Sequence, residues 1–124
     1  MSIGHKDSDN VVRKNTILGN KQGGVYWRAE TKPMAAHRVT FEHNTVKDNE
    51  GWGLYVDGAT QGTLIRNNVI EDTGVGRQKT GVRIGKQAGE VVLKDNTIKA
   101  SRPTLDEREE PLLKNSNNDR STEK

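Results

Sequence analysis

Five side chains with the chemistry to contact a ligand stand within or directly after three short segments that each begin with glycine. The segments are residues 24–27 (GVYW), 53–56 (GLYV) and 81–84 (GVRI). The five side chains are Tyr26, Arg28, Tyr55, Asp57 and Arg83. Tyrosine offers a flat apolar face to a sugar ring, and a guanidinium group pairs with a carboxylate or sulfate. The pattern therefore predicts binding of an acidic polysaccharide; the alternative is that tyrosine is an ordinary strand residue.

The glycine-led segments must be β-strands if these side chains are to share a face. Successive side chains of a strand point to opposite faces, so one column would point inward, and Tyr26, Tyr55 and Arg83 would point outward. The inward column is Val25, Leu54 and Val82. Two long connections, residues 29–38 and an insertion within 74–80, border the same outward face. Long connections are where functional side chains concentrate, so they favour this face as the binding surface.

A second column of the repeat is formed by four asparagines, spaced 29, 24 and 28 residues apart. They are Asn15, Asn44, Asn68 and Asn96. Three positions before them stand Val12, Phe41, Ile65 and Leu93, and two positions after them stand Ile17, Val46, Ile70 and Ile98. Apolar residues at fixed offsets over four repeats predict a solenoid with a thin core.

The asparagine column has a structural explanation. A sharp corner between strands needs a residue that tolerates positive φ, and among residues other than glycine, asparagine does so most readily. Stacked coils place equivalent residues about 4.8 Å apart, so their amides can form a hydrogen-bonded ladder. Leucine-rich repeats have an overlapping period, but they place a leucine-rich segment after the asparagine. Here glycine and β-branched alternation follow it, which favours a parallel β-helix.

The segment 39–49 (VTFEHNTVKDN), followed by 53–56 (GLYV), resembles repeats of the pectate-lyase-like family of right-handed parallel β-helices. The resemblance implies an all-β solenoid of about three coils with a polar C-terminal tail. It also implies that the glycine-led sheet carries the ligand groove on its outer face. Members of this family are expected outside the cell or at its surface, although the chain itself does not identify its compartment.

Catalytic equipment of that family is largely missing from this sequence. By resemblance, lyases use acidic clusters that bind Ca²⁺ plus a basic residue, and hydrolases use several aspartates on this sheet. The outward face offers only Arg28, Asp57 and Arg83. We therefore expect a non-catalytic carbohydrate-associated chain, with no catalytic residue, metal site or cofactor assigned. The alternatives are a structural spacer of a larger surface or tail protein, and a remnant of a polysaccharide lyase or glycoside hydrolase.

The chain divides into three parts on this interpretation: a leader at 1–9, the repeats at 10–100 and a polar tail at 101–124. The leader is too short and polar to bury the first coil. The tail is expected to be disordered, or to form a one-turn helix at 104–107 from which Leu105, Leu112 and Leu113 plug the last coil. Missing caps suggest a fragment of a longer solenoid, or end-to-end self-association through exposed strand edges.

Composition narrows the function classes. Hydrophobic residues make up 30% of the 124 residues and aromatic residues 4%, which excludes a thick globular core. There is no cysteine, hence no disulfide or thiolate site. No apolar run has the length of a membrane span. The net charge of +3 suits an acidic ligand, but no aromatic-basic interleaving accompanies it, so nucleic-acid binding is not expected.

Overall fold

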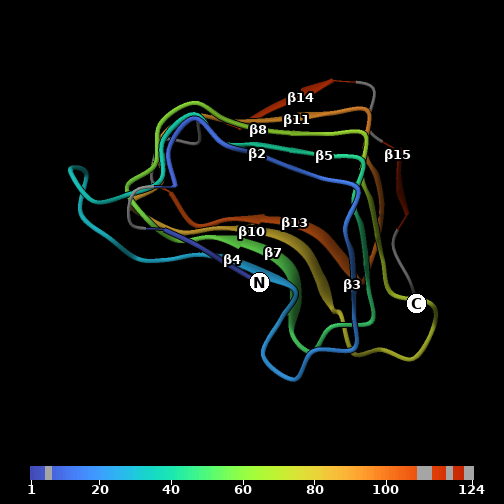
Figure 1. Cartoon of the computed structure of the whole chain (residues 1–124). Coiled ribbons are helices and arrows are strands. Elements are labelled where there is room, and N and C mark those ends of the chain that lie inside the picture. Colours follow the sequence, from blue (N-terminus) through green and yellow to red (C-terminus); the bar gives the residue numbers. More distant parts are fainter. Residues whose placement is uncertain (5–6, 109–112, 117–118, 122–124) are drawn as a thin grey trace.

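The chain forms a solenoid of short parallel strands, described by a computed structural model for residues 1–4, 7–108, 113–116 and 119–121, with side chains to residue 108. Three five-stranded sheets form its walls (Figure 1). Sheet A consists of β1 (Ser2–Ile3), β4 (Val25–Trp27), β7 (Trp52–Val56), β10 (Thr80–Ile84) and β13 (Arg102–Asp106). Sheet B consists of β2 (Val11–Arg13), β5 (Thr40–Glu42), β8 (Thr63–Arg66), β11 (Val91–Lys94) and β14 (Leu113–Ser116). Sheet C consists of β3 (Thr16–Leu18), β6 (Thr45–Lys47), β9 (Val69–Glu71), β12 (Thr97–Lys99) and β15 (Asp119–Ser121).

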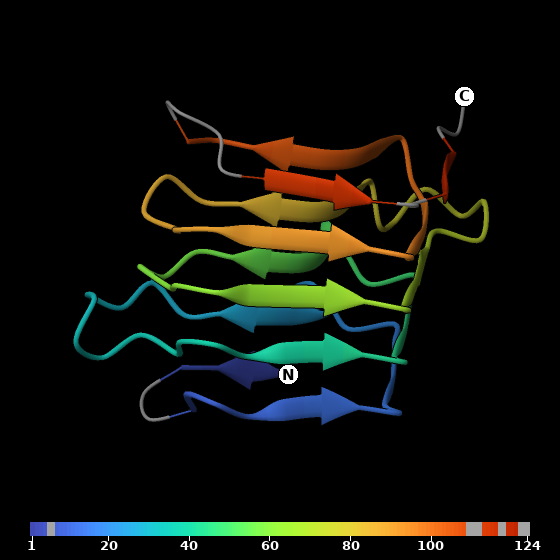
Figure 2. The same ribbon diagram turned by 90° about the horizontal axis from the view of Figure 1, so that it is seen from above.

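Each strand pairs in parallel with the equivalent strand of the next coil. The register keeps the repeat columns intact: Tyr26 lies opposite Tyr55, and Tyr55 lies opposite Arg83. Figure 2 shows the strands of one wall all pointing the same way, while those of the wall behind them run in the opposite direction. The sequence repeat is therefore also the repeat of the stack, and residues in one column are neighbours in space.

The core is a narrow apolar column between the three walls. The inward residues predicted from the repeat are buried, except for Val12 of the first coil, which is only partly buried. Val25, Leu54 and Val82 on sheet A are each 0% exposed. Trp27 adds the largest side chain and meets Phe41 edge-on, with ring centroids 5.6 Å apart. This predicted core is confirmed, and it explains how a chain of low hydrophobic content buries a continuous interior.

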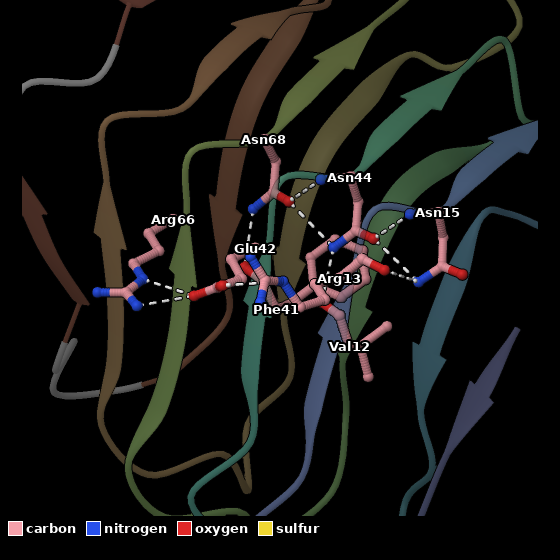
Figure 3. A network of polar contacts seen from close by, with 8 residues as sticks. All are labelled: Val12, Arg13, Asn15, Phe41, Glu42, Asn44, Arg66 and Asn68. Atoms are coloured by element: carbon pink, nitrogen blue, oxygen red, sulfur yellow. Dashed lines mark hydrogen bonds and ion pairs between the residues drawn. The ribbon is translucent and has the colours of Figure 1, made fainter.

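Side-chain amides form the predicted ladder at the corner between sheets B and C (Figure 3). The Nδ2 group of Asn44 donates to Oδ1 of Asn68 at 3.2 Å and to the Val12 carbonyl at 2.9 Å. Asn68 repeats both bonds one coil later, to Asn96 at 3.0 Å and to the Phe41 carbonyl at 2.9 Å. Each backbone N–H of the inner asparagines also donates to the next Oδ1. The bonds between asparagines therefore all run from one coil to the next, while the second N–H of each inner Nδ2 group donates to a carbonyl of the preceding coil.

The explanation given for the asparagines from sequence was wrong in one respect. Positive φ belongs to the residue before each asparagine, with values of 53° to 58°. These residues are Lys14, His43, Asn67 and Asp95. The left-handed residue is exposed at the corner, and the asparagine that follows it places its amide in the ladder. Asparagine is needed for its hydrogen bonds, whereas the preceding position accepts several exposed polar residues.

A second amide ladder, not predicted from the sequence, lies at the corner between sheets C and A. Asn20 donates to Oδ1 of Asn49 at 2.9 Å, and Asn49 donates to Oε1 of Gln78 at 2.9 Å. Asn49 and Gln78 are completely buried. The insertion in the third repeat hid this column, because Gln78 stands ten positions after Asn68 rather than five.

Both ends of the repeat region extend beyond the predicted range of 10–100. Ile3 of the leader is 4% exposed in β1, which pairs with β4. Neither the disorder nor the helix expected for the tail is found at residues 102–106, because β13 pairs with β10 there and continues sheet A. Leu105 lies opposite Arg83 on the outer face and does not plug the last coil, Leu112 is outside the described residues, and Leu113 begins β14. Nowhere in the described part is there a helix long and apolar enough to cross a membrane.

Candidate functional site

The outer face of sheet A brings together four of the five side chains predicted from sequence. Register places Tyr26, Tyr55 and Arg83 in one column, all half-buried, with Asp57 one position beyond the strand that carries Tyr55. Arg28 does not join them. Its guanidinium lies over Gly4 and contacts Ser2 Oγ at 3.3 Å and Glu30 Oε1 at 3.2 Å.

Three aromatic rings form the centre of this face, and we call Tyr26, Trp52 and Tyr55 the aromatic cluster. Ring centroids are 5.3 Å apart for Tyr26 and Tyr55, 5.4 Å for Trp52 and Tyr55, and 5.9 Å for Tyr26 and Trp52. The planes are tilted or edge-on to one another, which is the arrangement that aromatic quadrupoles prefer. The cluster is therefore a packed apolar platform, partly open to solvent.

Trp52 is the site residue that sequence reasoning missed. Strict alternation from Leu54 would turn Trp52 inward, but Gly53 and Leu54 are both buried, so the alternation is interrupted there. A Cβ on Gly53 would lie 2.8 Å from the Gly81 carbonyl oxygen and 2.8 Å from Cγ2 of Ile70, which explains the glycine. The glycine that begins the repeated segment, Gly53 in β7, marks this bend, and it was the available signal that the preceding residue faces outward.

Charged groups flank the aromatic cluster on one side. Tyr26 donates its hydroxyl hydrogen to Asp57 Oδ2 at 2.6 Å. The guanidinium of Arg83 lies 4.2 Å from the centre of the Tyr55 ring, in cation–π contact, and its Nε donates to Glu107 Oε1 at 2.6 Å. Gly85 leaves room for this arrangement, because a Cβ there would lie 2.6 Å from Asp57 Oδ1.

The surroundings shift the ionisation of these groups. Burial, with the negative charge of Asp57, raises the pKa of Tyr55 to about 12. Burial and the hydrogen bond to Asp57 also raise the pKa of Tyr26. The hydrogen bond from Arg83 lowers the pKa of Glu107. Both tyrosines are thus neutral hydroxyls near pH 7, suited to hydrogen bonding and ring stacking rather than to proton abstraction.

Two cavities on the outer face of sheet A share Trp52 as a wall. The first cavity, of about 790 Å³, also reaches Tyr26 and Tyr55 and is bordered by Asn20, Lys21 and Glu50. The second cavity, of about 490 Å³, lies toward the C-terminal coils and is bordered by Lys79, Arg83 and Arg102. The three rings of the aromatic cluster therefore line the first hollow, and Trp52 also lines the second. Each hollow is large enough for small ligand groups.

The insertion beside these cavities is held by one buried carboxylate. Asp72 accepts hydrogen bonds from the backbone N–H groups of Gly76 at 2.9 Å and Arg77 at 3.2 Å, and is 2% exposed. Among residues with described side chains, no group of three or more histidine, cysteine, aspartate or glutamate residues could hold a metal ion.

His37 lies in the long connection at 29–38 and attaches it to the next coil, since its Nδ1 accepts a hydrogen bond from the Gln61 backbone N–H at 3.1 Å.

Comparison with known proteins identifies the family of the fold. The family model described as right handed beta helix region matches residues 2–106, which includes β1 and β13 at its two limits. No curated protein and no solved structure gives a match. The match agrees with the three parallel sheets and the stacked repeat columns. The chain belongs to the right-handed β-helix family.

Proposed function

We propose that this protein binds carbohydrate, specifically an acidic polysaccharide, along the outer face of sheet A. The observation that carries the proposal is the aromatic cluster, whose three half-buried rings line the first cavity and whose Trp52 also lines the second. Aromatic rings are suited to the apolar faces of sugar rings, and nearby polar groups fix the orientation of hydroxyls. Asp57 and Arg83 supply such groups at the edge of the cluster.

A rigid support favours this function. Tyr26, Tyr55 and Trp52 lie on paired strands, and Asp57 and Arg83 hold two of the three rings in place. A preformed platform loses little side-chain entropy when a ligand binds. The face also follows the axis of the solenoid, so successive sugar units of an extended chain can contact successive coils.

Trp52 provides a direct probe for the proposal. The other tryptophan, Trp27, is 0% exposed in the core, so a ligand on sheet A changes the emission of Trp52 alone. The ligands to titrate are hexasaccharides that consist of uronate alone or of uronate together with other sugars. We expect them to change tryptophan fluorescence and to give binding heat by calorimetry. Replacing Trp52→Ala should weaken binding at least tenfold, which corresponds to about 1.4 kcal/mol.

The matched control for Trp52→Ala is Leu18→Ala, because Leu18 is a large apolar residue on another wall and is 56% exposed. This control should bind as the wild type does. The proposal is wrong if no acidic or uncharged glycan changes the emission of Trp52. It is equally wrong if both variants bind every glycan with unchanged affinity.

The alternative function is that of a structural spacer, and the two amide ladders favour it. They run through successive coils at two corners and join segments up to 29 residues apart in sequence. Such continuous internal hydrogen bonding suits a rigid rod that holds other parts of an assembly at a fixed distance. Stable folding of the chain without binding to any glycan would support this function.

A further inference from the structure

The second cavity on sheet A is lined by positive charge. Its lining includes Lys79, Arg83 and Arg102, together with Trp52, Thr80 and Leu105. None of the residues that line it is acidic. Because a concave surface of one charge sign raises the local concentration of counter-ions, this hollow attracts an anionic group.

Two of these three cations have no carboxylate partner among the residues with described side chains. Arg83 is paired with Glu107 at 2.6 Å, so its charge is largely compensated. Lys79 and Arg102 are exposed, and neither takes part in any of the ion pairs found in the described part of the chain. Their charges are therefore available to a ligand.

The fold places these two cations side by side and next to Trp52. Lys79 ends the insertion of the third repeat, and Arg102 begins β13 one coil later. The backbone N–H of Arg102 donates to the Lys79 carbonyl at 2.8 Å. Thr80 of β10 lies opposite both Trp52 and Arg102, so these three residues form one column across three coils, and Lys79 directly precedes Thr80.

The first cavity differs in charge. Its side chains include the amides of Asn20 and Gln22 and the opposite charges of Lys21 and Glu50. Met1 also lines it, but its ammonium group donates to the Gly24 carbonyl at 3.0 Å. The amides and the carboxylate of Glu50 make this cavity better suited to hydroxyl and N-acetyl groups than to an anionic group.

We propose that the second cavity is an anion subsite, in which Lys79 and Arg102 bind the carboxylate or sulfate of one sugar unit whose ring contacts Trp52. The neighbouring unit, in the first cavity, is uncharged. This inference rests on the proposed carbohydrate binding and makes it more specific. The ligand is a polysaccharide in which anionic and uncharged sugars alternate, and a polymer of uronate alone fits less well.

Four hexasaccharides test the inference by Trp52 fluorescence and calorimetry: alternating glucuronate and N-acetylglucosamine, a sulfated alternating chain, oligogalacturonate, and an uncharged β-glucan fragment. The alternating chains should bind at least tenfold tighter than the uncharged one and tighter than oligogalacturonate. Comparing the two alternating chains distinguishes carboxylate from sulfate. Raising the salt concentration should weaken binding of the charged chains only.

The double variant Lys79→Gln and Arg102→Gln should remove the preference for charged chains while Trp52-dependent binding of the uncharged chain persists. Its matched control is Lys94→Gln with Lys99→Gln, two exposed lysines of the adjoining sheets B and C. A preference that survives in the double variant, or tighter binding of oligogalacturonate, overturns this inference alone. Absence of Trp52-dependent binding for all four glycans overturns the proposed function and the inference together.

Discussion

Removing an interior amide of the first ladder tests the physical basis of the fold. The Asn68 side chain takes part in four hydrogen bonds, two donated to Phe41 O and Asn96 Oδ1 and two accepted from Asn44. In Asn68→Ala, two buried N–H groups of Asn44 lose an acceptor and the Phe41 carbonyl loses a donor. Each such loss costs about 1 kcal/mol, so we expect the free energy of unfolding to fall by about 3 kcal/mol.

Asn15→Ala is the matched control within the same ladder. Asn15 lies in the first coil, where its Nδ2 donates to Asn44 Oδ1 at 3.1 Å and to the Arg13 carbonyl at 3.1 Å. Asn44 Oδ1 still accepts the Asn15 backbone N–H after this change. No buried group is left without a partner, so the free energy of unfolding should fall by less than about 1 kcal/mol.

Urea unfolding followed by circular dichroism measures both variants. With a denaturant slope of about 1–3 kcal/mol per molar, the Asn68→Ala midpoint should fall by about 1–3 M and the slope should stay constant. The Asn15→Ala midpoint should move much less. Equal shifts for the two variants would refute the argument, because they would mean that burial of the amide does not set its contribution.

Two further predictions concern ionisation and association. Because the pKa of Tyr55 is raised to about 12, its contribution to stability is fully present below about pH 10 and is lost as the pH rises through 12. Asp57→Asn should lower that pKa in an ultraviolet titration, and an unchanged titration would contradict the assigned cause. The first coil exposes Val11 (57%) and Leu18 (56%) beside the edges of β2 and β3, so sedimentation should show concentration-dependent association. Val11→Lys with Leu18→Lys should reduce this association and Val75→Lys should not, whereas a monomer at every concentration would refute the prediction.

Much of the architecture was predictable from the sequence because residues of the same type recur at equivalent positions of each repeat. Columns of apolar residues around Asn15, Asn44, Asn68 and Asn96 predicted the parallel stack, and the ladder and core confirm it. The outward positions of Tyr26, Tyr55 and Arg83 followed from alternation within short strands. These features depend on local periodicity, which a sequence shows directly.

Other features were decided only by contacts between coils. The bend at Gly53 turned Trp52 outward, and the insertion concealed Gln78 as a member of the second ladder. The tail that looked disordered supplies β13, which brings Arg102 beside Lys79 and Glu107 beside Arg83. Residues that meet across the stack lie more than 20 positions apart, so their proximity depends on bends and insertions that change the register. Sequence alone thus determined the columns and their approximate faces, and the stacking of the coils decided which columns meet to form the site.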